Sequence, residues 1–414
     1  MVLDPKKRQQ ILRSIKKLVV NHHINIAGID YSAWTARMEA QTPELLAGDL
    51  QSFEAGIRSL LTELKTSHTA FYHSLPTELP PQHTINATLR DVSLNGVHKW
   101  MFLDVFQGGP ADIAEIRPGD ILETVDDAGC LPPLAPHFTV GHSHTLTIAK
   151  RGGAGTERIV LKVPHRKGTK QRPPMVEPKS PVHAIIGPSI GLLTVPYFPG
   201  AAGMAFSNAL DRAVHDLKQQ GCTRLILDLR GNIGGSLGFA RLASYMCSGQ
   251  IAIGHSLTPH RLRSGYSLQN LHAVPMPRTK VGLVFTLARF AFRDKSVILL
   301  TQGLGSQPFH NRIVVIVNEW TNSAAEMVAA FAGENRLATI VGIKTRGNVL
   351  GASNFQVGCG YWLRLPVFGW NTSKGRSLEG DGVSPDVAVD VSPDGLGAGH
   401  DDQMARAIEI VKSL

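Results

Sequence analysis

The sequence predicts a mixed α/β protein with more than one domain, and three observations support this class. Short apolar runs alternate with helical patterns in the second half of the chain, amphipathic helices fill its start, and β-rich sequence lies between them. A chain of 414 residues is long enough for two or three domains. With 43% hydrophobic and 18% charged residues, it has the composition of an ordinary globular protein.

The first 75 residues are predicted to form a helical domain. Asp4 followed by Pro5 is typical of a helix N-terminus, and apolar residues then recur at helical spacing from Ile11 to Val19. A second amphipathic stripe runs from Phe53 to Leu64 and stops at the polar sequence that contains His68. The start of the chain carries charged residues and no apolar signal region, so we expect a cytoplasmic location.

Residues 76–165 are predicted to form a β-rich domain. Trp100–Phe106, Gly109–Ala114, Arg117–Leu122 and His144–Gly153 resemble, in this order, a PDZ module, whose sheet edge binds peptide termini. Glu115 stands where such modules usually have glycine. Residues 166–183 are basic and rich in proline, and we interpret them as a linker.

Residues 184–414 are predicted to form an α/β core. Ile190–Phe198, Leu225–Leu229 and Ile313–Val317 have the pattern of buried strands, and Met204–Gln220 and Gln403–Leu414 that of helices. Ser323 lies at an elbow between the strand Ile313–Val317 and a helix over Ala324–Ala332, where open α/β sheets place their ligands. Ser323 and Glu326 also have the spacing of a capping box, which requires only the start of a helix.

Four motifs in register resemble the C-terminal processing (tail-specific) serine peptidase family over nearly the whole chain. Besides the Ser323 elbow, they are Leu225–Gly235, Ile340–Gly347 and Glu379–Asp386. The resemblance implies an N-terminal helical domain, a PDZ-like domain and a ClpP/crotonase-like α/β catalytic core. It also implies a serine endopeptidase that forms an acyl-enzyme on protein or peptide substrates.

The resemblance implies a set of site residues. Ser323 is the expected nucleophile, and the oxyanion donors are the backbone N–H of Ala324 and that of Gly234 or Gly235. Many members use a lysine after Thr-x-Gly, but here the run Thr345–Asn348 has asparagine in that place. The chain is therefore either inactive or similar to the tricorn-like branch, which uses a Ser-His-Glu triad.

In that branch His68 matches the general base and Glu379 the group that fixes its tautomer, with Asp381 as an alternative to Glu379. Asp386 is expected to cap a turn. A histidine with a pKa near 6.5 suits a base at neutral pH, and a glutamate beside it raises that pKa modestly. We therefore expect activity to rise through a midpoint near neutrality. Lys344 could replace His68 only if it were strongly desolvated.

Other functions fit the sequence less well. The glycine-rich run Gly231–Gly238 resembles a dinucleotide-binding turn. That fold requires an acidic residue about twenty positions further on, and none is present there. A non-catalytic protein that binds peptides or apolar ligands on the same fold, as in the retinoid-binding relatives, is the main alternative. The scattered Cys130, Cys222, Cys247 and Cys359 suggest reduced thiols, and we expect no metal and no cofactor.

The net charge of +9 is unevenly distributed. The stretch from Leu229 to Arg293 contains no Asp or Glu and, with Arg293 included, eight Arg or Lys. We interpret this stretch as a solvated face because no nucleic-acid motif accompanies it, and no apolar run is long enough to span a membrane. The expected partner is a protein or peptide substrate, with neither nucleic acid nor membrane, and the oligomeric state is left open.

Overall fold

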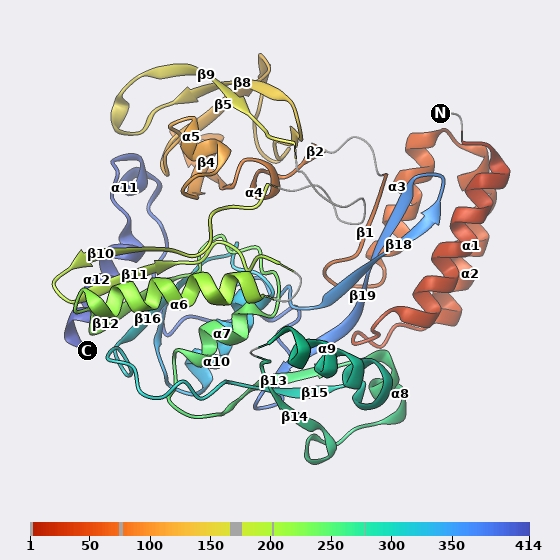
Figure 1. Cartoon of the computed structure of the whole chain (residues 1–414). Coiled ribbons are helices and arrows are strands. Elements are labelled where there is room, and N and C mark those ends of the chain that lie inside the picture. The colour runs from red at the N-terminus through yellow and green to blue at the C-terminus, as the bar shows by residue number, and fades with distance from the viewer. Residues whose placement is uncertain (1–2, 74–77, 166–175, 201–202, 278) are drawn as a thin grey trace.

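The computed structural model describes residues 3–73, 78–165, 176–200, 203–277 and 279–414. Figure 1 shows three parts: a group of helices at the N-terminus, a β-rich part, and an α/β core from which a long β-ribbon reaches back to the helices. This arrangement confirms the predicted fold class. The domain boundaries, including the 166–183 linker, stay predictions, and residues 166–175 lie outside the described residues.

The N-terminal part consists of α1 (Pro5–His22), α2 (Tyr31–Ala47) and α3 (Leu50–Thr62). Each begins after an aspartate whose side chain accepts backbone N–H groups of the first turn, which satisfies donors that a helix start leaves free. The sequence analysis did not predict α2, whose apolar face is narrow. Its Trp34 is fully buried and donates from Nε1 to the carbonyl of Leu60 (2.8 Å).

The β-rich part is a sheet in which neighbouring strands are antiparallel. Its order is β3 (Ala87–Leu94), β4 (Val97–Val105), β5 (Ile121–Val125), β8 (Ser143–Ala149) and β9 (Thr156–Lys162). The same part of the chain contains two short helices, α4 (Pro81–Thr84) and α5 (Pro110–Ile113). It also contains the short strands β2 (Glu78–Leu79), β6 (Ala128–Gly129) and β7 (Phe138–Thr139). Glu115 has φ +59, a left-handed conformation that glycine adopts more easily, which explains why PDZ modules usually have glycine at this position.

The core is built on a sheet ordered β10 (Val182–Gly187), β11 (Ile190–Thr194), β12 (Arg224–Asp228), β16 (Ile313–Val317), β17 (Thr339–Gly342) and β20 (Val387–Ala388). From β11 onward all pairs are parallel. Because side chains alternate along a strand, Ile313, Val315 and Val317 pack in the larger apolar cluster, whereas Val314 and Ile316 pack in a second one.

Helices therefore cover both faces of this sheet. α6 (Met204–Gln219), α7 (Gly238–Ser244) and α10 (Ala324–Glu334) contribute to the larger cluster, and α12 (Asp402–Ser413) contributes to the second. α11 (Pro393–Gly397) precedes α12. The parallel strands, with their carboxyl ends at one edge, place the turn after β12 beside the elbow after β16.

A second sheet joins the two ends of the chain. Its order is β1 (Ala70–His73), β19 (Tyr361–Thr372), β13 (Ala252–Leu257), β15 (Val297–Leu300) and β14 (His272–Pro275), and β18 (Gly351–Gly358) also pairs with β19. Figure 1 shows β18 and β19 as a long ribbon between the N-terminal helices and the core. The β1–β19 pairing fixes the segment just before β1, which contains His68.

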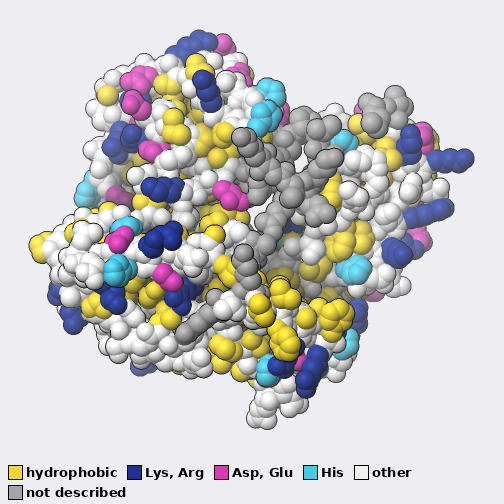
Figure 2. Space-filling model, in the orientation of Figure 1, with side chains coloured by type: hydrophobic (Ala, Val, Ile, Leu, Met, Phe, Trp, Pro, Cys, Tyr) yellow, Lys and Arg dark blue, Asp and Glu magenta, His cyan; other side chains and the backbone are white. Residues whose placement is uncertain are grey.

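The helices α8 (Pro259–Ser264) and α9 (Lys280–Arg289) lie between strands of this second sheet in the chain. The side chains of Val281, Phe285 and Phe292 around α9 are 69–86% exposed, and Figure 2 shows hydrophobic side chains gathered on the lower part of the visible face. None of the helices among the described residues is long and apolar enough to cross a membrane.

Phe71 holds β1 in place, so its removal should weaken the structure. The side chain is 4% exposed, and its ring stacks on that of Tyr361 with centroids 4.9 Å apart. Phe71→Ala should lower the free energy of unfolding by about 3–5 kcal/mol, as for other buried aromatic truncations, in a urea titration. Val97→Ala, at a half-exposed side chain, should change it by less than about 0.5 kcal/mol. Equal effects of the two substitutions would contradict the packing role of Phe71.

Candidate active site

Ser323 occupies a strained turn between β16 and α10. Its backbone has φ +55 and ψ −117, a conformation that costs energy for any residue with a side chain. Asn322 precedes it, and the N–H of Asn322 donates to the carbonyl of Asn232 in the turn after β12 (2.8 Å). The elbow predicted from the sequence is therefore present and is tied to the glycine-rich turn.

Glu326 holds this elbow from inside the protein. Its carboxylate is fully buried and accepts from the N–H of Ser323 (2.8 Å), as in a capping box. It also accepts from the Thr345 hydroxyl (2.6 Å) and from the N–H groups of Gly347 (2.7 Å) and Asn348 (2.9 Å). Burial raises the pKa of Glu326, and these four donors oppose that shift. One carboxylate thus joins the start of α10 to the loop 345–348.

The glycine-rich turn packs directly against Ser323. A Cβ atom added to Gly234 would lie 2.6 Å from the Cβ of Ser323 and 3.1 Å from its Oγ. The N–H of Gly234 already donates to the Oδ1 of Asn232 (2.7 Å). In the part of the chain that the structure describes, the N–H groups of Gly235 and Ala324 donate to no protein acceptor. Of the two expected glycines, the structure therefore leaves Gly235 with the available donor.

His68 lies at the end of a hydrogen-bonded chain that begins at Glu379. Glu379 Oε1 accepts from the N–H of Ser67 (2.7 Å), and Oε2 accepts from the Ser67 hydroxyl (3.0 Å). The same Oγ lies 2.8 Å from Nδ1 of His68. Since the hydroxyl proton points to the carboxylate, Oγ can only accept from Nδ1–H, which leaves a lone pair on Nε2. The direct contact expected between Glu379 and His68 is not formed, because Ser67 lies between them.

His68 and the residues beside Ser323 line one cleft of about 720 Å³. His68, Tyr72 and Arg364 come from one side of the cleft, whereas Ile233, Asn322 and Asn348 flank the glycine turn and the elbow. Among the described residues, no hydrogen bond joins His68 to Ser323. Hydrogen bonds between catalytic groups are often long without a substrate and tighten when it binds.

The electrostatic surroundings of His68 differ from the sequence-based expectation. Burial lowers the pKa of His68 to about 4, and the nearby positive charge of Arg364 lowers it further. The expected modest rise in the pKa of His68 is wrong, because burial and the charge of Arg364 lower it, and Glu379 makes no direct hydrogen bond to the imidazole but bonds to Ser67. His68 is therefore neutral and able to accept a proton over the whole neutral range.

Known proteins of one peptidase family are similar to this chain. The model of the family described as peptidase family S41 matches residues 189–389. The chain belongs to peptidase family S41. The carboxyl-terminal-processing protease of Synechocystis sp. is 26% identical over 204 residues, which cover 49% of this chain and 39% of that protein. The putative tricorn protease homolog 2 of Streptomyces coelicolor is 24% identical over 387 residues, which cover 87% of this chain and 28% of that protein.

Two solved structures share the fold. The photosystem II D1 C-terminal processing protease gives a TM-score of 0.56 at 17% identity, covering 94% of this chain and 96% of that one. Mature CPAF complexed with lactacystin gives 0.57 at 16% identity, covering 99% of this chain and 98% of that one. This S41 chain matches these two structures over nearly their whole length, but it spans less than half the length of the two curated relatives named above.

The other candidate residues lie in settings that do not suit a triad. Lys344 pairs with Asp381 (3.1 Å), and each side chain is more than half exposed. Asp381 also pairs with Arg376 (3.2 Å), so neither residue is desolvated or directed at His68. Asn348 donates from Nδ2 to the Oδ1 of Asn322 (2.9 Å). In this S41 chain, the position that is a lysine in many members is therefore occupied by an amide, which hydrogen-bonds to the residue before Ser323.

Sequence analysis missed one residue of the site and gave another only a local role. Ser67 connects Glu379 to His68, and its only signal was its place immediately before the candidate histidine. Glu326 was noticed, but only as half of a capping box. Asp386, expected to cap a turn, accepts from the N–H of Ile340 (2.8 Å) and so ties the loop before β20 to β17.

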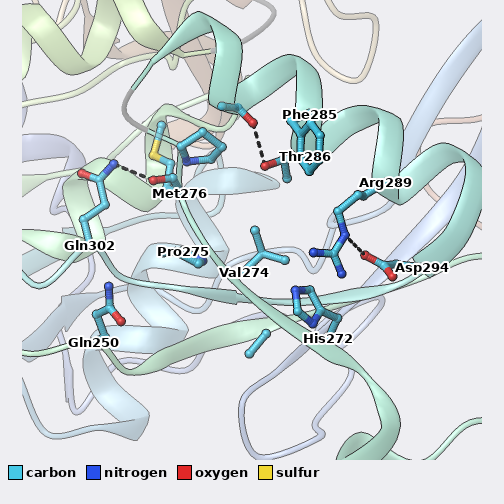
Figure 3. Close-up of a pocket in the computed structure, with 13 residues that line it drawn as sticks. Gln250, His272, Val274, Pro275, Met276, Phe285, Thr286, Arg289, Asp294 and Gln302 are labelled. Atoms are coloured by element: carbon cyan, nitrogen blue, oxygen red, sulfur yellow. Dashed lines mark hydrogen bonds and ion pairs between the residues drawn. The ribbon is translucent and has the colours of Figure 1, made fainter.

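A second cavity, of about 440 Å³, lies beside α9 and β14 and contains none of the predicted site residues. Figure 3 shows Arg289 and Asp294 on one side of it and Gln302 near Met276 on the other. Among the described residues, no group of three or more His, Cys, Asp or Glu could hold a metal ion. This cavity therefore adds no chemical group to the cleft that His68 lines.

The two glycines beside the elbow should respond differently to an added methyl group. Gly234→Ala places Cβ against Ser323 itself, so kcat should fall at least about a hundredfold, the loss typical of a disturbed oxyanion site. Gly235→Ala places Cβ 2.2 Å from the backbone oxygen of Phe198, so it should lower the melting temperature more. Gly96→Ala is the matched control, because Gly96 has φ +79 and no atom within 4 Å of an added Cβ. Equal losses of activity in all three variants would contradict this account.

Proposed function

We propose that this chain is a serine endopeptidase that uses Ser323, His68 and Glu379, with Ser67 as the connecting group. The observation that carries the proposal is that one cleft is lined both by His68, which a carboxylate orients through Ser67, and by Asn322 and Ile233. Asn322 directly precedes the strained Ser323, and Ile233 lies in the glycine-rich turn that packs against it. Membership of S41, a family of serine peptidases, supports this reading. Protein or peptide chains are the proposed substrates.

The proposed reaction begins when a peptide carbonyl enters the cleft beside Ser323. The Oγ attacks the carbonyl carbon while Nε2 of His68 takes the hydroxyl proton. The resulting oxyanion is stabilised by the N–H groups of Ala324 and Gly235. His68 then gives its proton to the leaving amine, which produces an acyl-enzyme. A water molecule, activated by the same imidazole, hydrolyses the ester and restores Ser323.

Ser67 and Glu379 act on His68 without touching the substrate. Their hydrogen bonds hold the proton on Nδ1, and the carboxylate stabilises the imidazolium that forms during the attack. The N–H of Val349 also donates to Glu379 (2.9 Å), so the carboxylate is held by the residue after Asn348 as well as by Ser67. These contacts support Glu379 over Asp381 as the third member of the site.

Ser323 should react with a fluorophosphonate probe, because such probes modify activated serines. We expect one adduct, located on Ser323 by peptide mapping, and its loss in Ser323→Ala together with a fall in peptidase activity of roughly a thousandfold or more. Ser353→Ala, at an exposed serine of β18, is the control and should label normally. Labelling that persists in Ser323→Ala would exclude this nucleophile. Absence of labelling in the native chain would favour the non-catalytic ligand-binding alternative.

Activity should be lost on acidification with a midpoint well below neutrality. Because burial lowers the pKa of His68 to about 4, Nε2 stays unprotonated above that pH, and kcat/KM should be flat from about pH 6 to 8. A midpoint near pH 7 would show that His68 is not buried as described, or is not the base.

The same burial affects stability, so the pH profile needs a folding control. Burial lowers the pKa of His23 and His83 to about 4 as well. Between pH 6.5 and 4 the unfolded chain then binds more protons than the folded one, so the free energy of unfolding falls as pH falls through this window. Circular dichroism at each pH separates loss of the base from loss of the fold.

A further inference from the structure

The cleft lined by His68 and Asn322 also contains an arginine with no counter-charge, Arg364. Side chains alternate along β19, so Tyr361, Leu363 and Leu365 pack into the apolar cluster of the N-terminal helices. Arg364 lies on the opposite face and lines the cleft. On β1 its Cα partner is Ala70, two residues after His68, and Ala70 also lines the cleft.

Arg364 is mostly buried but has no acidic partner. Among the described residues it makes no ion pair and no hydrogen bond, and burial lowers the pKa of its guanidinium. Another mostly buried arginine of this chain, Arg230, has acidic partners. It contacts Asp228 at 2.7 Å and Asp401 at 2.8 Å. A buried charge without a partner is costly, so an arginine kept in this state is expected to meet an anion at some stage of function.

The rest of the cleft does not supply that anion. Glu54 already pairs with Arg58 (2.7 Å) and accepts from the hydroxyl of Tyr361 (2.7 Å). Glu78, the other acidic residue of the lining, is exposed. Arg346 adds a further cation, stacked 4.0 Å from the ring centre of Trp320 and without an ion pair in the described part of the chain. The lining therefore carries an excess of positive charge.

His83 adds an unused polar group to the same cleft. Its buried Nδ1 has no hydrogen-bond partner among the described residues. A neutral imidazole with its proton on Nδ1 donates one hydrogen bond, and the planar guanidinium of arginine donates two parallel bonds to a carboxylate. Together these groups match the donor pattern that a carboxylate accepts.

We propose that Arg364 forms a carboxylate-binding subsite of the cleft, which binds an acidic group of the peptide near the scissile bond. The inference rests on the proposed peptidase function, whose substrate class it narrows. The carboxylate is either the side chain of an Asp or Glu residue or the free C-terminus of the peptide. Both sources have the same chemistry, and the guanidinium would pair with either.

Binding to an inactive protein tests the subsite without relying on catalysis. Ser323→Ala protein is immobilised and exposed to randomised decapeptides, half with a free C-terminus and half with a C-terminal amide. Mass spectrometry of the retained peptides measures enrichment of Asp and Glu over Asn and Gln, and of carboxylate over amide. We expect at least about tenfold enrichment of one carboxylate source, as for hydrogen bonds to charged groups, and its loss in Ser323→Ala/Arg364→Met.

The control is Ser323→Ala/Arg158→Met, which removes an equal charge from an exposed arginine paired with Asp127 in the β-rich part. It should keep the enrichment. Thermal unfolding of Arg364→Met should show an unchanged or higher melting temperature, since an unpaired buried cation is removed, whereas a structural role would lower it. Ser323→Ala/Arg364→Lys keeps the positive charge but loses the two parallel donors of the guanidinium, so it should retain only part of the enrichment.

Two outcomes would overturn the proposal. Equal retention of peptides with a free and an amidated C-terminus by Ser323→Ala protein, together with no enrichment of Asp and Glu over Asn and Gln, would show that the subsite does not exist, whatever the variants do. Enrichment that survives Arg364→Met would assign it to another group. Neither outcome concerns Ser323 labelling, so failure of the subsite and failure of the peptidase proposal are distinguishable.

Discussion

The arrangement of the cleft depends on one contact between distant parts of the chain, the pair of hydrogen bonds from Ser67 to Glu379. These residues are separated by 312 positions, and the same two bonds position the imidazole of His68. The contact is possible because β1 pairs with β19 directly after His68, which brings the N-terminal part of the chain to the core. The N-terminal helices thus serve the site by anchoring the strand that carries the histidine.

The other half of the cleft is fixed by a buried carboxylate rather than by a long-range strand. Glu326 accepts four hydrogen bonds, and it links the start of α10 to the loop that ends at Asn348. Such a network is costly to bury unless every group is satisfied, and here the donors are backbone N–H groups and one hydroxyl. It stabilises the strained backbone of Ser323 and keeps the N–H of Ala324 directed outward. Strain at the nucleophile is thereby offset by interactions that the substrate does not touch.

Local features of the fold could be predicted from the sequence, whereas the relations between distant groups could not. The Asp4 cap, the helix predicted over Met204–Gln220 and the elbow at Ser323 follow from residue preference and periodicity. The structure confirms them, with the helix ending one residue earlier, at Gln219. The position of Ser67 between Glu379 and His68 could not be inferred, because the spacing of motifs does not show which side chains contact each other. The lowered pKa of His68 and the unpaired charge of Arg364 depend on burial, which only the assembled sheets create.

The central claim is that Glu379 acts on His68 through Ser67, and a double-mutant cycle tests it most directly. Ser67→Ala, Glu379→Gln and the double variant are compared with the native chain by kcat on one peptide substrate, with folding checked by circular dichroism. If the two residues form one chain to the imidazole, each single substitution should lower kcat, and the double variant should be no worse than the more damaging single one. Additive losses would show that Ser67 and Glu379 act independently and would contradict the account.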